Sequence, residues 1–414
     1  MNPELRFKEQ DGNDFPDWEE KKIKEIGRVT MCKRIFKDQT LAWGEIPFFK
    51  IGTFGDIPDA YITRELFEDF KKKYPYPQKG NILISASGSI GKLVEYNGED
   101  AYFQDSNIIW LEHKNDVLDK YLKQIYPTLN WEEGLEGSTI KRLYNKVFLN
   151  KVIFLPQVLE QSKIAALLSD IDKKIESQAI LVEKLKNTKD AMFVKMFLQG
   201  DSKTPEIRFD RFSGDWKEKK LGEICETITD GAHNSPKEVS NSRGYYMPSV
   251  KDMTNNGFDF SECKQISEYD FEMLRRQGCM PKVGDILVSK DGSILSFCFS
   301  VKEEANYVIL SSIAIIRPKQ EINSLFLEQY FKRDCFKKLT INQYSKGNAL
   351  KRIILKDFKT IKIQIPPTIQ EQEKIGQFFS NLDKEIEINQ QKYEKLCDVK
   401  KALLSKLFPT KEDE

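Results

Sequence analysis

Two long stretches of the chain place apolar residues at alternating spacings of four and three positions. One pattern runs over residues 164–196 and the other over residues 375–407. Such heptads, continued for nearly five repeats, predict long amphipathic helices, each with an apolar seam that packs against another helix. Pro156 and Pro367 stand just ahead of the two patterns, where a helix tolerates proline. A helix over residues 164–198 would be about 50 Å long.

The two seams are interrupted by polar residues at equivalent places. Gln178 matches Asn389, and Lys189 matches Lys400. A polar seam residue costs stability but disfavours slipped registers. Because the seams match in length and in their interruptions, we expect the two helices to pack on each other as a coiled coil. The alternative is homodimerisation through each helix separately, and the sequence leaves the relative direction of the helices open.

Short motifs outside the helices also occur twice, so the chain is an internal duplication. The second occurrence follows 202 to 211 residues after the first, which requires insertions or deletions between the motifs. The repeated motifs are Pro3-Glu4-Leu5-Arg6-Phe7 with Pro205-Glu206-Ile207-Arg208-Phe209, Asp17-Trp18 with Asp215-Trp216, Gly80-Asn81-Ile82-Leu83 with Gly284-Asp285-Ile286-Leu287, Lys141-Arg142-Leu143 with Lys351-Arg352-Ile353, and Glu160-Gln161 with Glu371-Gln372.

The regions ahead of the helices have mixed strand and helix patterns. Strands are predicted at residues 81–84, 107–111, 285–289, 312–316 and 360–365, and short helices at residues 63–73 and 325–338. The polar segment 199–205 contains Gly and Pro and separates the copies. We expect an α+β protein with two similar domains, two long helices and internal two-fold pseudo-symmetry. Its domains are residues 1–155 and 200–366, and its helices are residues 156–199 and 367–409.

Composition excludes several kinds of protein. Lys and Arg number 65 and Asp and Glu number 64, so the protein has no global basic coat, although local basic patches remain possible. Seven cysteines without a C-x-x-C pair and only two histidines argue against a disulfide framework, a metal centre and His-based catalysis. Neither a membrane span nor an apolar signal-peptide core is present, so we expect a cytoplasmic protein.

Searches for catalytic motifs return only near misses. Residues 86–93 resemble a phosphate-binding loop, but Ala86 and Leu93 occupy positions that require glycine and a hydroxyl. Asp59, Asp69 and Lys71 fit a loose nuclease pattern, yet the last two lie in a predicted amphipathic helix. We find no methyltransferase, dinucleotide-binding or serine-hydrolase motif. We therefore expect a binding protein without catalytic residues, metal or cofactor.

Basic and polar stretches lie at equivalent places in the two copies. Residues 137–151 contain four basic residues and no acid, and residues 343–362 contain six basic residues and one acid. Such stretches suit contacts to phosphates, and the polar loops 84–92, 229–237 and 288–294 can bond to base edges. The alternatives are a strand edge protected by lysines and ordinary turn chemistry.

The order of the duplicated motifs resembles the specificity subunit of type I restriction–modification systems. The loop of residues 229–236 also resembles one near the start of target recognition domains in that family, whereas residues 31–40 of the first copy depart from it. The resemblance implies that each domain reads half of a split target in double-stranded DNA. It also implies that the helices set the spacing and dock two methylation subunits. Methyl transfer would belong to the methylation subunits and cleavage to restriction subunits, so neither reaction would take place on this chain.

We assign candidate DNA contacts from these loops and basic stretches. They are Lys50, Thr53, Ser87, Ser89, Lys92, Lys141, Arg142, Asp230, His233, Asn234, Ser235, Lys251, Lys290, Asp291, Ser293, Tyr344, Lys346, Lys351 and Arg352. Two other functions remain open: a coiled-coil scaffold that binds protein partners, and an enzyme with an unrecognised active site.

Overall fold

The computed structural model describes residues 2–133, 142–239, 244–345 and 352–409. The candidate contacts Lys141, Lys346 and Lys351 lie outside these ranges. The chain divides into two compact units, residues 1–179 with 392–414 and residues 180–391. Each unit therefore contains one α+β domain and a part of both long helices. No helix within the described ranges is long and apolar enough to cross a membrane.

The first unit contains a sheet in the order β2-β8-β5-β6, a smaller sheet β4-β3-β7 and the pair β1-β9. Its elements ahead of the long helix are β1 (Glu19–Lys22), α1 (Ile23–Ile26), β2 (Gly27–Thr30), η1 (Lys37–Gln39), β3 (Ile46–Phe49), η2 (Ile51–Thr53), β4 (Tyr61–Ile62), α2 (Arg64–Lys73), β5 (Ile82–Ser85), β6 (Leu93–Glu95), β7 (Tyr102–Phe103), β8 (Ile108–His113), α3 (Asp119–Ile125), η3 (Tyr126–Thr128), α4 (Asn145–Asn150) and β9 (Val152–Leu155).

The second unit repeats this plan with a sheet in the order β11-β16-β14-β15 and the pairs β12-β13 and β10-β17. Its elements ahead of the second long helix are β10 (Lys217–Lys220), α6 (Leu221–Ile224), β11 (Cys225–Asp230), β12 (Tyr245–Tyr246), η4 (Val250–Asp252), β13 (Gln265–Ile266), α7 (Glu268–Arg276), β14 (Ile286–Ser289), β15 (Cys298–Ser300), β16 (Ile313–Pro318), α8 (Ser324–Lys332), α9 (Asp334–Tyr344), α10 (Leu355–Phe358) and β17 (Lys362–Ile365).

The predicted strands are present, with ends that differ by one or two residues. The helix predicted over residues 63–73 is α2, with Thr63 as its N-cap. The single helix predicted over residues 325–338 is wrong, because Arg333 is extended and separates α8 from α9. The Arg333 guanidinium lies 4.4 Å from the ring centre of Phe197 and 4.0 Å from that of Tyr330. This packing stabilises the break between α8 and α9, which the sequence pattern does not predict.

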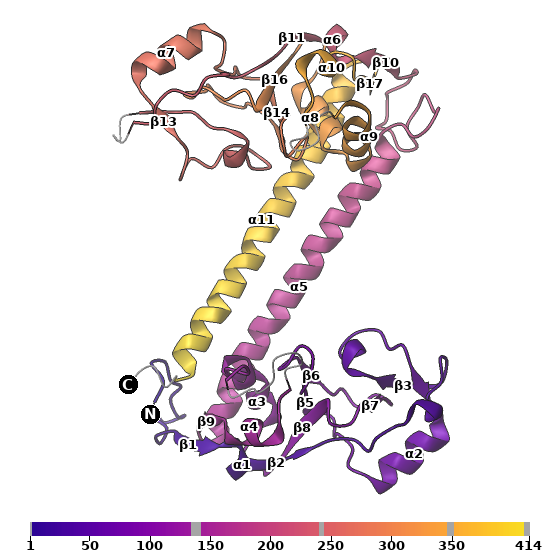
Figure 1. Cartoon of the computed structure of the whole chain (residues 1–414), viewed down its shortest axis with the longest axis vertical. Helices are drawn as coiled ribbons and strands as arrows, with labels where there is room; N and C mark the ends of the chain where they lie inside the picture. The colour runs from indigo at the N-terminus through magenta and orange to yellow at the C-terminus, as the bar shows by residue number, and fades with distance from the viewer. Residues whose placement is uncertain (1, 134–141, 240–243, 346–351, 410–414) are drawn as a thin grey trace. The chain divides into compact units, whose positions relative to one another are not determined.

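The two long helices are α5 (Val158–Met196) and α11 (Ile369–Leu407). Every position of both predicted seams is buried or half-buried, as helix pairing requires. In the second unit Phe193 of α5 stacks on Phe379 of α11, with ring centres 4.3 Å apart. Residue numbers rise along one helix as they fall along the other, so the pair is antiparallel (Figure 1). This settles the direction that the sequence left open.

The lysines that interrupt the seams have buried or half-buried acidic partners on the opposite helix. Lys400 donates to Asp172 in the first unit, and Lys189 donates to Asp383 in the second. Burial alone would raise the pKa of Asp383, but the ammonium groups of Lys332 and Lys189 outweigh it and lower that pKa. The two lysine interruptions therefore form specific pairs, which a shift in helix register would break.

The repeated motifs outside the helices form the same buried contact in each unit. Glu160 is fully buried and accepts hydrogen bonds from Arg6 at 2.8 Å and from the Trp18 indole at 3.0 Å. In the second unit, fully buried Glu371 accepts bonds from Arg208 (2.7 Å) and Trp216 (3.3 Å). These motifs thus attach the start of each domain to the first turns of a long helix.

Candidate nucleic-acid interface

In the first unit, the predicted polar loop joins the end of β5 to two distant segments. The Ala86 backbone N–H donates to the Asn107 carbonyl at 2.7 Å, and the Ser87 hydroxyl donates to Asn107 Oδ1 at 2.9 Å. Ser87 also forms a bridge with Arg142, whose Nη2 donates to the Ser106 carbonyl at 3.2 Å. The structure therefore brings Ser87 and Arg142 together, although 55 positions separate them in the chain. We call this the first corner.

The segment at the end of β3 joins the same corner. The Ile51 N–H donates to Gln104 Oε1 at 2.8 Å, which connects η2 to the segment ahead of β8. The Thr53 hydroxyl accepts a bond from the Lys50 N–H at 3.2 Å, and the Lys50 ammonium lies 2.9 Å from Asp59. The Thr53 hydroxyl is thus used to close a turn, and Lys50 is held in an exposed ion pair.

The second unit builds an equivalent corner from equivalent backbone contacts. The Lys290 N–H donates to the Ser312 carbonyl at 3.0 Å, and the Ile353 N–H donates to the Lys290 carbonyl at 3.0 Å. Asp291 forms a bridge with Arg352, as Ser87 does with Arg142. The exposed Arg352 and the half-buried Asp291 therefore occupy the positions of Arg142 and Ser87. We call this the second corner.

A buried serine closes the polar loop in both corners. The Ser85 hydroxyl donates to the Ser89 carbonyl, and the Ser289 hydroxyl donates to the Ser293 carbonyl at 2.6 Å. The loop N–H of Lys92 returns a bond to Ser85 Oγ at 2.8 Å. Ser89 and Ser293 thus support the loop through their carbonyls, while their side chains and that of Lys92 are exposed. The loop over residues 86–93 is a turn between strands, as the sequence indicates.

The two corners differ most where a buried ion pair replaces apolar packing. Lys290 is 8% exposed and lies 3.3 Å from Asp230, whereas the equivalent Ala86 is 1% exposed. The exposed His233 lies 3.3 Å from the same Asp230 carboxylate. Since burying a charge pair rarely adds stability over apolar packing, this pair points to a role in arranging the second corner.

The loop of residues 229–236 reaches the second corner through a close backbone contact. A Cβ at Gly231 would lie 2.0 Å from the Ile309 carbonyl oxygen, so only glycine fits there. Ser235 accepts a bond from the Lys264 ammonium at 2.6 Å, while Asn234 and His233 are exposed. All three side chains are thus exposed, and Ser235 is bonded to Lys264 within the domain.

Other predicted contacts have different surroundings. Tyr344 ends α9, packs against the apolar core and lies with its hydroxyl 3.5 Å from the Thr360 carbonyl. Lys251 is exposed near Asp252. Lys151, in the first basic stretch, is buried and bonds to Glu133 at 2.8 Å, so its charge is paired within the domain. The first basic stretch is thus partly neutralised, as a protected strand edge would be.

Sequence reasoning did not select several polar residues of the corners. Asp105, Asn107 and Ser312 lie just ahead of β8 or β16, and Arg34 follows β2 and donates from Nε to Asp105 at 2.9 Å. The only sequence signal for the first three was their position at the start of a predicted strand, for Asn107 and Ser312, or two residues ahead of one, for Asp105. Arg34 lies in the segment that departs from the family loop.

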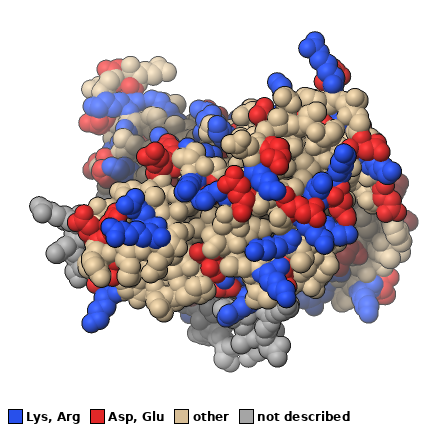
Figure 2. Space-filling model, turned by 90° about the horizontal axis from the view of Figure 1, so that it is seen from above, with Lys and Arg blue, Asp and Glu red and all other residues tan. Residues whose placement is uncertain are grey.

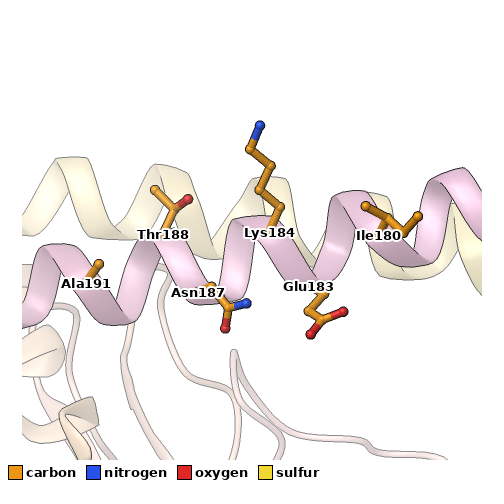
Figure 3. Close-up of a pocket in the computed structure, with 6 residues that line it drawn as sticks. All are labelled: Ile180, Glu183, Lys184, Asn187, Thr188 and Ala191. Atoms are coloured by element: carbon orange, nitrogen blue, oxygen red, sulfur yellow. The ribbon is translucent and has the colours of Figure 1, made fainter. Parts of the chain in front are cut away.

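The charged residues on the face drawn in Figure 2 do not form a single basic field. Figure 2 shows acidic and basic side chains interspersed on the face in view. A groove of about 440 Å³ on α5 is lined from Ile180 to Ala191. There Lys184 and Thr188 point to one side of the helix and Glu183 and Asn187 to the other, without converging polar groups (Figure 3). Within the described ranges, no group of His, Cys, Asp or Glu is arranged to hold a metal ion.

Comparison with known proteins gives matches along almost the whole chain. The model of the type I restriction modification DNA specificity domain matches residues 16–187 and again residues 213–397. A putative type I restriction enzyme specificity subunit of Haemophilus influenzae is 51% identical over 149 residues, which are 36% of this chain and 38% of that relative. The putative MjaX specificity subunit of Methanocaldococcus jannaschii is 24% identical over 99% of this chain and 97% of its own.

A solved structure shares the fold. The crystal structure of a type I restriction-modification system S subunit from M. genitalium has a TM-score of 0.66 and 18% sequence identity. The match covers 99% of this chain and all of that one. The α+β class with two domains and two long helices is therefore confirmed.

Proposed function

The chain belongs to the family of type I restriction modification DNA specificity domains, and we propose that each of its two copies recognises half of a bipartite DNA target. The observation that carries this proposal is the pair of corners. They share a backbone framework and differ in side chains, with Ser87 and Ala86 in one and Asp291 and Lys290 in the other. A common framework with different side chains is what two readers of different sequences need.

The candidate residues divide by chemistry into two kinds of contact. Lys50, Lys92, Arg142 and Arg352 supply positive charge for phosphates, which positions the duplex without reading it. Ser87, His233, Asn234 and Asp291 can donate to or accept from base edges. The same roles extend to Lys141, Lys346 and Lys351, which lie outside the described residues. Asp230 and Lys290 form the buried ion pair of the second corner, and Lys251 is exposed near Asp252. The remaining candidates, Thr53, Ser89, Ser235, Ser293 and Tyr344, support loops or the core through the contacts described above.

The antiparallel helices would hold the half-sites at a set spacing and dock methylation subunits. We assign residues 1–155 and 200–366 to recognition, and residues 156–199 and 367–409 to spacing. Catalysis, both methyl transfer and cleavage, would lie in methylation and restriction subunits, and this chain would need no cofactor of its own. A role on cellular DNA places the protein in the cytoplasm.

Methylation mapping tests the proposal directly. Cells that express the chain with its methylation subunit should acquire modified DNA at one bipartite sequence with a gap of constant length. Ser87→Ala should alter one half of that sequence and Asp291→Ala the other. Arg28→Ala, which removes an exposed ion pair to Glu112 away from the first corner, is the control and should alter neither. Modification without a bipartite sequence would refute the proposal.

A scaffold that binds only protein is not favoured, because both copies match a DNA specificity domain. Gel retention separates the two functions. The complex with its methylation subunit should retain duplex DNA that contains the mapped target more strongly than random duplex. Equal retention of both would support the scaffold.

A further inference from the structure

The first corner contains an arginine whose guanidinium is held in place by a bond from Nε. Arg34 follows β2, and its side chain is 59% exposed. Nε donates to Asp105 Oδ2 at 2.9 Å, and among the described residues no partner is found for its two terminal nitrogens. A guanidinium held through Nε can turn its terminal N–H groups outward as a planar fork.

The carboxylate that holds Arg34 belongs to a rigid segment. Asp105 is followed by Ser106, which has φ +52° in the left-handed region, and by Asn107, which accepts the Ser87 hydroxyl bond. Arg142 donates to the Ser106 carbonyl from the other side. Left-handed serine is strained and persists only where neighbouring contacts enforce it. Arg34 is therefore anchored to the same three-residue segment that joins Ser87 and Arg142.

The chemistry of this fork selects one base. A planar pair of terminal N–H groups matches the O6 and N7 acceptors of guanine in the major groove. By contrast, Arg142 uses its Nη2 on a backbone carbonyl, and Lys50 is paired with Asp59. In the second corner, the segment that follows β11 presents His233, which lies 3.3 Å from Asp230 and whose imidazole has no such fork. The two half-sites should therefore differ at the base that faces this position.

We propose that Arg34 reads a guanine in the half-site of the first domain and that Asp105 is its positioning residue. This proposal rests on the proposed function, since it names the base that one corner of that interface recognises. The residue lies in the segment that departs from the family loop, so the first domain uses a different side chain for the same task.

The test measures binding and methylation by the complex of the full chain with its methylation subunit. Methylation mapping first gives the wild-type target. In Arg34→Ala, discrimination at one G·C pair of one half-site should fall about 5- to 150-fold, with the other half-site unchanged. Arg34→Lys keeps the charge without the fork, so it should lose most of the same discrimination. Arg28→Ala, with another exposed arginine of the same domain, should change nothing.

Further variants test whether Asp105 positions Arg34 or only stabilises the fold. Asp105→Ala should relax the same base pair as Arg34→Ala, and the double variant should lose no more than Arg34→Ala alone. Asp105→Asn keeps an oxygen that can accept from Nε, so it should restore part of the discrimination. Thermal unfolding of each variant identifies any that fail to fold, and Arg34→Lys then decides the outcome.

Several results would overturn the inference while leaving the proposed function intact. Equal weakening on all sequences, with a salt slope reduced by about one, would make Arg34 a phosphate contact. A relaxed base in the other half-site, or a half-site for the first domain without any G·C pair, would also overturn it. If the wild-type complex has no bipartite target, the proposed function itself fails.

Discussion

Glu371 offers the sharpest test of how the second domain is attached to α11. Its carboxylate is fully buried and accepts two bonds from Arg208, at 2.8 and 2.7 Å, and one from Trp216. Glu371→Ala leaves the Arg208 guanidinium, 15% exposed, without a counter-charge. Breaking a buried pair in this way costs about 3–5 kcal/mol, against about 0.5 kcal/mol or less for an exposed surface residue.

The assay is urea unfolding of the full chain, followed by hydrogen exchange to assign each transition to a unit, because a protein of two units need not unfold in one step. Glu373→Ala, an exposed neighbour on the same helix, is the matched control. Replacing both partners, with Arg208→Met and Glu371→Leu, should recover most of the loss, since no charge is then left buried. The reasoning is refuted if Glu371→Ala costs no more than Glu373→Ala or destabilises only the first unit.

Three further predictions concern the spacing, the DNA contacts and the effect of pH. Removing one heptad from both α5 and α11 should shorten the gap in the mapped target by about three base pairs, at 1.5 Å per residue and 3.4 Å per base step, with the half-sites unchanged; altered half-site bases would contradict this. Arg352→Ala should weaken binding to all duplexes and lower the salt slope by about one in titrations at several salt concentrations, and an unchanged slope would exclude a phosphate contact. The Asp119 carboxylate, 3.2 Å from His113 Nε2, raises the pKa of His113 above 6.5. Denaturation of wild type and His113→Gln across pH should therefore show an advantage for wild type that is full below about pH 6.5 and is lost as pH rises through the raised pKa; an advantage that grew with pH would refute this.

Local patterns were sufficient to predict the two long helices, five of the strands, helix α2 and the duplication. The heptads around Lys189 and Lys400 identify both long helices, because a helix seam repeats within a few residues of sequence. The strand patterns of β8 and β16 are equally local. The helix break at Arg333 was missed because no Gly or Pro marks it, and because stacking on Phe197, which follows α5 and lies more than 130 positions earlier, maintains it.

In the candidate interface, the sequence pattern indicated where the loops lie but not the surroundings of each side chain. Ser87 and Arg142 lie in stretches selected for their polar and basic composition, and the structure joins them. Composition did not distinguish Lys151, which is buried against Glu133, from lysines that face solvent. Arg34 was not selected because its value as a contact depends on Asp105, 71 positions away.

The amino-acid sequence alone determined that this protein is two copies of one plan, each with an α+β domain and a long helix, because periodicity and motif order are properties of neighbouring residues. Tertiary structure alone decided the antiparallel direction of the helices, the acidic partners of the seam lysines and the composition of the two corners. These features depend on pairs such as Lys189 with Asp383, which are 194 positions apart and meet only once the chain has folded.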